Sequence, residues 1–564
     1  MSRSPTKLPR LVAAIAVLAF GARDVGAQYT TTPAPAAYAL KGVTVVGADG
    51  GRSAGVTIVV RGGLIESMGP GVAIPAGAQL LEGDSLVVYP GLVDAQGAAK
   101  FNFPAVEMDR ATVKSWDAPR TLQGFTPHRR VVDVLQATGK DVADQRKGGV
   151  VAVAVHPDAA LMAGQSTVLI LRPSASTPAE LVVDPDAGVL FALRGARGVY
   201  PGTMFATTTF IRQAFEDAKH TKVVQAAYAR DAKGMVRPPN DPDYDILQRV
   251  LAGDERVFFA ANTPEEIGYA VRLGDQYGFT PVIVGGRDAW KLTDLLKEKK
   301  VTVLASVDFP KPKRWKPDAK SEGAAAEPME AAVRREKEET EEAYANAGKL
   351  AKAGIRVALT SGGGKADLRE GARKAVEYGL SEAEALRAVT STPAELLGLS
   401  RLMTLTPGAP ATFVVANGAL FGEDTKVVYT LVDGELETGR AGTAAARTAT
   451  TAAGASGAAS AVAGKWSLDL ESSQGSLGGS MTLAGTAESF TGSIDTEMGV
   501  LPIKGGKVTG GNVAFTVVFP FMQDAEIPFT GTMANGVLSA TASTPMGEVK
   551  VSGKRSGPGA TENN

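Results

Sequence analysis

The fifteen residues Val87–Phe101, VVYPGLVDAQGAAKF, separate two patterns of sequence. Before them, residues 40–87 form short β-like runs divided by turn clusters such as Arg61-Gly62-Gly63. After them, up to about Leu399, apolar strand-like runs alternate with helical segments. Continuous apolar runs are expected where helices cover both faces of a parallel sheet. The stretch therefore marks the passage from a small β unit into an α/β barrel, for which roughly eight such units suffice.

Length and composition limit the class of protein. With 564 residues the chain is too long for one ordinary core, so we expect two or more domains. The formal net charge is −1, and no basic patch with interleaved aromatic residues occurs, which argues against a nucleic-acid partner. Cysteine is absent, which excludes disulfides, thiolate metal ligands and a cysteine nucleophile.

The N-terminus is typical of an export signal. Three basic residues precede the apolar segment Leu11–Ala22, and Val25-Gly26-Ala27 offers the small residues that a signal peptidase needs. We expect a signal peptide over residues 1–27 and a periplasmic or secreted bacterial protein. The alternative is an N-terminal membrane anchor, although Arg23 and Asp24 interrupt the run. No second segment is apolar enough to span a bilayer.

The remaining pattern predicts the domain order. A flexible leader (28–39) precedes a composite β-sandwich made of residues 40–87 and 402–437, and the barrel occupies residues 88–401. An Ala/Gly/Thr linker (438–464) leads to an antiparallel β domain (465–555) and a disordered tail (556–564). The charged residues 311–345 predict a loop and a solvated helix, or alternatively a lid over the barrel mouth.

Two helix starts are marked by capping residues. Thr263, Pro264 and Glu266 form a capping box with proline at the first helical position. Ser381 with Glu384 repeats the box.

Three separated blocks resemble the imidazolonepropionase-like branch of the metal-dependent amidohydrolase superfamily. They are the β unit leading into Val87–Ala95, the block Gly148–Ile170 with Gly164-Gln165-Ser166, and the segment Gly354–Gly434 with ALRAVTSTPAELLGL. The resemblance implies a (β/α)8 TIM-like barrel and a hydrolase of C–N bonds other than peptide bonds. It also implies zinc or another divalent metal that activates a water molecule.

A narrower resemblance concerns Val199–Met204 and Phe210–Phe215, which look like a block of exported bacterial proteins with two amidohydrolase modules in tandem. One module of such proteins often lacks the metal-binding histidines. This resemblance implies a metal-competent amidohydrolase as a partner.

The positions of the family's metal ligands carry no ligands here. The His-x-His motif after the first barrel strand is Gln96-Gly97-Ala98, and two later histidine positions hold Ala260 and Gly285 or Gly286. The aspartate position on the last strand is Gly362, after Ser361. We therefore expect Gln96, Ala98, Ala260, Gly285, Ser361 and Gly362 to line a pocket without metal.

A replacement site is the alternative. His156 ends the second barrel strand with Asp158 nearby, and Asp94 and Asn262 are expected at the same mouth. These residues are the candidates for a non-standard amide, cyclic-amide or peptide hydrolase. The structural interpretation is that hydrogen bonds satisfy the ring of His156 and that Asp94 stabilises the end of its strand. His128 and His220 are expected to be exposed.

The leading hypothesis is an exported amidohydrolase-fold protein that has lost metal-dependent catalysis and binds a partner or small ligand. A third possibility places the function in the C-terminal β domain, as a ligand-binding or envelope-binding module.

Overall fold

The computed structural model divides the chain into two compact units, Met1–Arg447 and Thr448–Asn564. The first is described for residues 37–439 except 84, 105–112, 196–197 and 311–325. The second is described for residues 464–555 except 473–474, 487, 497–498, 510–511, 520–524, 535–536 and 545–546. The signal peptide, most of the leader and linker, and the tail lie outside the described residues.

A composite β domain joins the two ends of the first unit in one eight-stranded sheet, in the order β16-β15-β14-β5-β1-β2-β3 with β4 beside β1. Its strands are β1 (Tyr38–Val46), β2 (Arg52–Arg61), β3 (Leu64–Gly69), β4 (Gln79–Leu80), β5 (Val87–Pro90), β14 (Phe413–Ala416), β15 (Val427–Val432) and β16 (Glu435–Thr438). The two chain segments meet where β5 pairs antiparallel with β14, opposing Tyr89 and Val414. β1 begins at Tyr38, inside the residues expected as a leader.

The barrel is a second eight-stranded sheet, in the order β13-β12-β11-β10-β9-β8-β7-β6. Its strands are β6 (Leu92–Asp94), β7 (Val150–Val155), β8 (Met162–Ile170), β9 (Val182–Ala192), β10 (Val257–Ala261), β11 (Val282–Gly285), β12 (Thr302–Ser306) and β13 (Val357–Thr360). The barrel fold predicted from the sequence is confirmed. One detail differs from uniform β/α units: β8 runs antiparallel to both β7 and β9.

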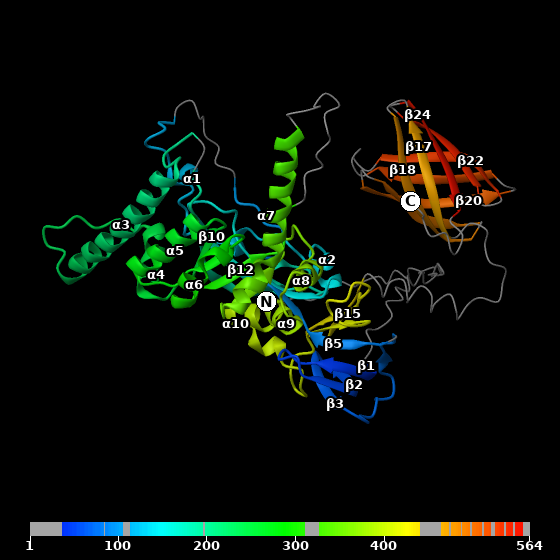
Figure 1. The fold of residues 1–564 in the computed structure, drawn as a ribbon, viewed down its shortest axis with the longest axis horizontal. Helices are drawn as coiled ribbons and strands as arrows, with labels where there is room; N and C mark the ends of the chain where they lie inside the picture. The colour runs from blue at the N-terminus through cyan, green and yellow to red at the C-terminus, as the bar shows by residue number, and fades with distance from the viewer. Residues whose placement is uncertain are drawn as a thin grey trace, which may run out of the picture. The chain divides into compact units, whose positions relative to one another are not determined.

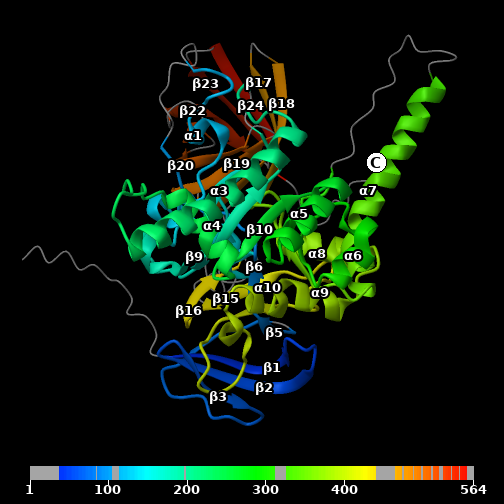
Figure 2. The same ribbon diagram turned by 90° about the vertical axis from the view of Figure 1, so that its left-hand side faces the viewer.

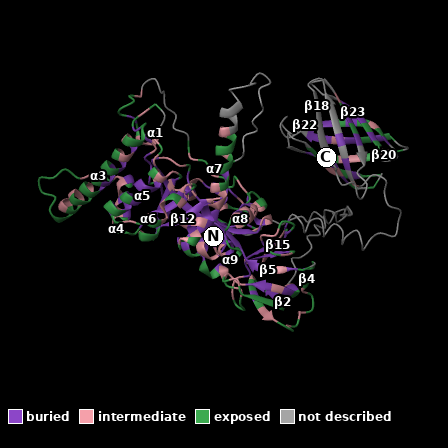
Figure 3. Cartoon of the chain, viewed as in Figure 1, coloured by how far each residue is buried: buried purple, intermediate pink, exposed green. Residues whose placement is uncertain are grey.

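Alternating side chains of the strands separate two cores. On β10, Phe258 belongs to a cluster with Leu304 and Ala358 from other strands, whereas Phe259 packs in a second cluster that includes helix residues such as Ile267. Because successive side chains of a strand point to opposite faces, the first cluster fills the barrel and the second lies under the helices. Figure 3 shows this burial along the strands and the exposed surfaces of α3 and α7.

Helices surround the strands of the barrel (Figures 1 and 2). They are α1 (Arg120–Gln123), α2 (Ala143–Lys147), α3 (Met204–Arg230), α4 (Pro242–Ala252), α5 (Pro264–Tyr277), α6 (Thr293–Glu298), α7 (Ala326–Lys352), α8 (Leu368–Glu377), α9 (Glu382–Val389) and α10 (Ser391–Leu396). Both views show α7 projecting away from the barrel. Part of the charged segment 311–345 is therefore the solvated helix that was expected, and its loop lies outside the described residues.

The predicted capping residues start their helices. The Thr263 hydroxyl accepts from the Glu266 amide at the start of α5, and the Glu266 carboxylate accepts from the Thr263 amide, which completes the box. The Ser381 hydroxyl accepts from the Glu384 amide before α9. These bonds satisfy amides that have no partner within the helix, so the boundaries follow from local sequence.

The second unit is a closed antiparallel barrel in which each strand pairs with the next and β17 pairs with β24. Its strands are β17 (Gly464–Ser472), β18 (Gly475–Gly485), β19 (Phe490–Thr496), β20 (Gly499–Thr509), β21 (Asn512–Phe519), β22 (Ala525–Ala534), β23 (Val537–Thr544) and β24 (Gly547–Arg555). Trp466, Phe490, Phe515 and Phe529 lie in its buried core.

A buried ion pair ties the barrel to the composite β domain. Arg146 at the end of α2 donates from Nε and Nη2 to Glu437 of β16, at 3.0 and 2.7 Å, and from Nη1 to the Gly139 carbonyl. The Thr430 hydroxyl of β15 donates to the Arg146 carbonyl. These contacts hold the domain against the end of the barrel that is remote from the strands' carboxyl ends.

Within the described residues, no helix combines the length and apolarity that crossing a bilayer requires.

We expect Arg146→Ala to lower the free energy of unfolding by about 3 kcal/mol, because it leaves Glu437 largely buried without its cation. The side chains of Arg146 and Glu437 are 3% and 18% exposed. Urea unfolding followed by the circular dichroism of the helices measures the change. Arg356→Ala is the control: its pair with Glu395 is 45% and 58% exposed, and about 0.5 kcal/mol is expected. Equal losses in both variants would contradict the prediction.

Candidate functional site

A cavity of about 580 Å³ opens at the carboxyl ends of the barrel strands, where barrel enzymes carry their sites. Seven of the predicted residues contribute to its wall: Gln96, Ala98, His156, Ala260, Asn262, Gly285 and Gly362. They lie at the carboxyl ends of five different strands or directly after them, so the fold brings together positions up to 266 residues apart in the chain. Asp94 and Ser361 are the exceptions: they lie at a smaller neighbouring cavity of about 260 Å³.

The wall does not offer the donors that a catalytic divalent metal needs. The five positions at which the resemblance leads us to expect metal ligands present one amide, two methyl groups and two glycines (Gln96, Ala98, Ala260, Gly285 and Gly362). Neighbours also occupy the space of a side chain: a Cβ on Gly285 would lie 2.6 Å from Asn262 Oδ1, and one on Gly362 would lie 2.7 Å from Ser306 Oγ. Among the described residues, no three His, Asp or Glu side chains converge as metal ligands. The family's metal therefore does not fit these residues.

Asp94 joins the first and last strands of the barrel. Its Oδ1 accepts from the Gln96 amide at 3.0 Å and from the Ser361 amide at 3.2 Å. β6 and β13 are the two ends of the sheet order; Asp94 is the last residue of β6, and Ser361 directly follows β13. Burial raises the pKa of Asp94, and the hydrogen bonds from Ser361 and Gln96 oppose that shift. These hydrogen bonds agree with the expectation that Asp94 stabilises the end of its strand.

Both ring nitrogens of His156 already have partners. Nε2 lies 2.9 Å from the Ala95 carbonyl oxygen, to which it must donate, so Nδ1 is the acceptor of the Ser166 hydroxyl at 2.7 Å. The ring also packs edge-on against Phe258 with 4.7 Å between ring centroids. Burial lowers the pKa of His156 to about 4, although the bond to Ala95 opposes the shift. The imidazole is therefore neutral near pH 7, with no lone pair directed into the cavity.

Asn262 is placed by the start of α5. Its backbone amide donates to Glu266 Oε2 at 2.8 Å, and its Oδ1 lies 3.5 Å from the Arg287 amide. Glu266 lines the cavity too, but its carboxylate is occupied by the capping box. Asp94, His156 and Asn262 thus belong to three separate hydrogen-bonded groups. None of these bonds joins one of the three side chains to another.

Several residues of the wall were not singled out by the sequence. Arg194, after β9, and Lys365, after β13, both line the cavity, together with Asp158, which the sequence had placed near His156. Ser166 was quoted only as part of a block, yet it fixes the tautomer of His156. A single charged residue in a loop has no sequence pattern that marks it as part of a binding site. The contact between Ser166 and His156 depends on the antiparallel pairing of β7 with β8, which the sequence did not predict.

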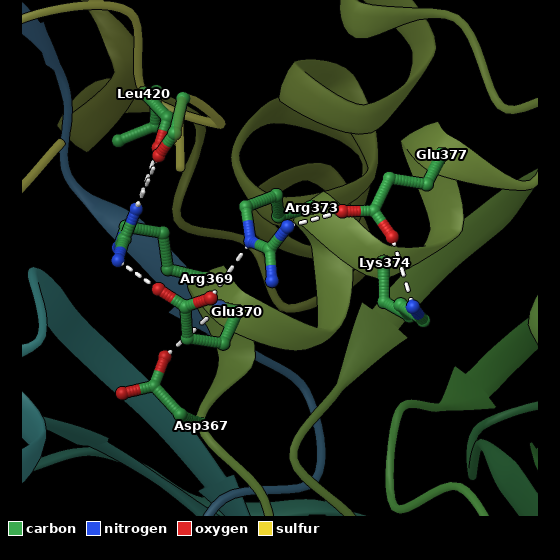
Figure 4. Close-up of polar contacts among 8 residues, drawn as sticks. Asp367, Arg369, Glu370, Arg373, Lys374, Glu377 and Leu420 are labelled. Carbon is green, nitrogen blue, oxygen red and sulfur yellow. Dashed lines mark hydrogen bonds and ion pairs between the residues drawn. The ribbon is translucent and has the colours of Figure 1, made fainter. Parts of the chain in front are cut away.

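The backbone of Lys365 lies between a glycine turn and the start of α8 (Leu368–Glu377). Gly362, Gly363 and Gly364 all have positive φ, which places this turn in a conformation that other residues rarely adopt. The Gly363 amide donates to the Gln96 carbonyl at 2.7 Å. Figure 4 shows the helix that follows: Asp367 caps it, and Arg369 donates to the Leu420 carbonyl while also contacting Glu370.

The comparisons with known proteins agree with this fold. Residues 294–437 match the model of the Amidohydrolase family. An amidohydrolase from Thermotoga maritima superposes with a TM-score of 0.56 at 23% identity, covering 72% of this chain and 100% of that one. A prolidase solved with N-methylphosphonate-L-proline gives 0.42 at 18% identity, covering 72% and 100%. No curated protein matches the chain.

Residues 294–437 therefore resemble the Amidohydrolase family, and the first of these solved structures has the same fold as this chain. What those proteins hydrolyse does not transfer to this chain by fold alone.

We expect Asp94→Ala to lower the free energy of unfolding by about 3 kcal/mol, since the amides of Gln96 and Ser361 lose a buried acceptor. Asp94→Asn keeps one carboxamide oxygen in nearly the same volume, so a loss of about 1 kcal/mol or less is expected. Urea unfolding of both variants checks this, and similar losses would show that Asp94 does not act through these two bonds.

The neutral His156 makes stability depend on pH. Its folded pKa of about 4 lies below the ordinary value of 6.5, so between these values the unfolded chain binds more protons than the folded one. The stability that this histidine provides is therefore complete above pH 6.5 and is lost as the pH falls toward 4. Unfolding of the wild type and of His156→Gln at several pH values should show their difference shrinking over this window. A stability difference between the two proteins that does not change with pH would contradict the lowered pKa of His156.

Proposed function

We propose that this chain is an exported amidohydrolase-fold protein that binds a small ligand without catalysing metal-dependent hydrolysis. The observation that carries the proposal is the wall of the barrel mouth. Its ligand positions present amide, methyl and glycine groups, while its one histidine has both nitrogens engaged. A cavity of about 580 Å³ nevertheless remains, within the range of small-molecule sites.

The same geometry argues against the alternative of a hydrolase centred on His156. A general base needs a free nitrogen within hydrogen-bond reach of the proton it removes. Nδ1 of His156 accepts from Ser166, and Nε2 carries the proton donated to Ala95. Asp94 is 1% exposed and lines the neighbouring cavity, so it does not share a reacting centre with Asn262. Export itself rests on the expected signal peptide over residues 1–27.

The direct test measures the metal content of the purified mature protein after dialysis against buffer with trace zinc. Less than about 0.1 equivalents of divalent metal is expected, because structural and catalytic zinc sites need three or four nitrogen, oxygen or sulfur ligands. Dialysis of an active amidohydrolase alongside gives the positive control. Near-stoichiometric metal that is lost in His156→Ala would refute the proposal and favour the alternative hydrolase. If any amidase activity survives in His156→Ala, it does not depend on this histidine.

A partner role is a second candidate, favoured by the segment that resembles tandem amidohydrolases. Tyr200 and Met204 of its first block and the adjoining Phe205 leave large apolar surfaces exposed at the start of α3, and Phe205 is 82% exposed. Scattered apolar residues are normal on surfaces, but three within six positions favour contact with another protein. The expected partner is a metal-competent amidohydrolase. Co-expression and co-purification with and without Phe205→Ser test it, and failure to associate would count against it.

The C-terminal β barrel offers a third candidate, a ligand- or envelope-binding module. Its described core is filled by large side chains, including Trp466 and Phe529, so any binding would use its outer face.

A further inference from the structure

Three charged side chains at the wall of the barrel cavity have no partner. Lys365, Arg194 and Asp158 all line it and are exposed. Across the described residues, none of the three side chains takes part in an ion pair or a hydrogen bond. By contrast, the neighbouring Arg287 contacts Asp288, and Glu266 closes a capping box. Two positive side chains and one negative side chain of the wall are therefore without a partner among the described residues, while Glu266 keeps its negative charge but directs its carboxylate at the backbone amides of Asn262 and Thr263.

These charges are spread around the mouth by the order of the strands. Asp158 follows β7, Arg194 follows β9 and Lys365 follows β13, next to β6 across the seam of the barrel. Between them the wall carries the amide side chains of Gln96 and Asn262 and apolar groups such as Phe101 and Leu190. The arrangement offers separate positions for two anionic groups and one cationic group, with an apolar surface between them.

We propose that the cavity binds a small molecule with two carboxylates and one ammonium group, as in an acidic amino acid. This proposal rests on the proposed binding function and names its ligand class. Arg194 and Lys365 each contact one carboxylate, Arg194 through its planar pair of donors, and Asp158 contacts the ammonium group. Gln96 and Asn262 provide further hydrogen bonds. Because the three charges are exposed, binding is modest in strength and weakens with added salt.

The test is titration calorimetry of the mature full chain, dialysed against EDTA and then returned to metal-free buffer, with L-glutamate as the probe. L-glutamine is the matched ligand because it replaces one carboxylate by a neutral amide of the same shape. Saturable binding of L-glutamate, about tenfold tighter than that of L-glutamine, is expected. Lys365→Met and Arg194→Gln should each weaken L-glutamate binding about tenfold, and whichever of them removes the contact to the side-chain carboxylate should also abolish most of the preference over L-glutamine.

Lys337→Met is the matched control because it removes the same charge from an exposed position on α7. It should leave the affinity unchanged. No saturable binding of L-glutamate either without or with zinc, equal affinity for L-glutamine, or equal effects of Lys337→Met and Lys365→Met would each overturn the ligand class. Repeating the titration with zinc separates the two proposals. Binding of L-glutamate that requires zinc would overturn the metal-independent function and leave the ligand class standing.

Discussion

The contact between the first and last strands of the barrel is the constraint on which the site depends. β6 and β13 are the ends of the sheet order, and polar contacts of the residues after them join these ends. Asp94 accepts from the Ser361 amide, and the Gln96 carbonyl accepts from the Gly363 amide. A buried carboxylate is costly unless hydrogen bonds satisfy it, so this joint holds only while both amides point at Asp94. The joint in turn places Gln96 and the glycine turn on the wall of the cavity.

Hydrogen bonds and close packing fill the part of the barrel mouth where the resemblance to amidohydrolases led us to expect metal ligands. His156 is fixed between Ala95 and Ser166, and Asn262 fills the space beside Gly285. Such a wall is preorganised for binding, because its polar groups do not have to rearrange. It is poorly suited to proton transfer, since the histidine is neutral and both of its nitrogens are engaged. The unpaired charges of the mouth then become the groups available to a ligand.

Apolar runs and capping residues in the sequence predicted several strands and helix starts correctly. The apolar runs at Val150–Val155 and Val257–Ala260 lie in β7 and β10, and Thr263 caps α5 as expected. Each depends on neighbours within a few residues. The antiparallel course of β8 was not anticipated, because an apolar run has the same composition in either direction. Ser361 was expected in the main pocket and lies at the smaller one, because its amide turns toward Asp94.

The barrel fold could be predicted from the sequence, because the apolar strand runs and the helix caps depend on residue type and local order. Tertiary structure alone decided what His156 does, since its two partners lie on different segments, 10 and 61 residues away. It also decided that Arg194, Asp158 and Lys365 share one cavity, where none of their side chains pairs with another described residue. Contacts between residues distant in the chain arise from the closure of the barrel, and a linear pattern does not encode them.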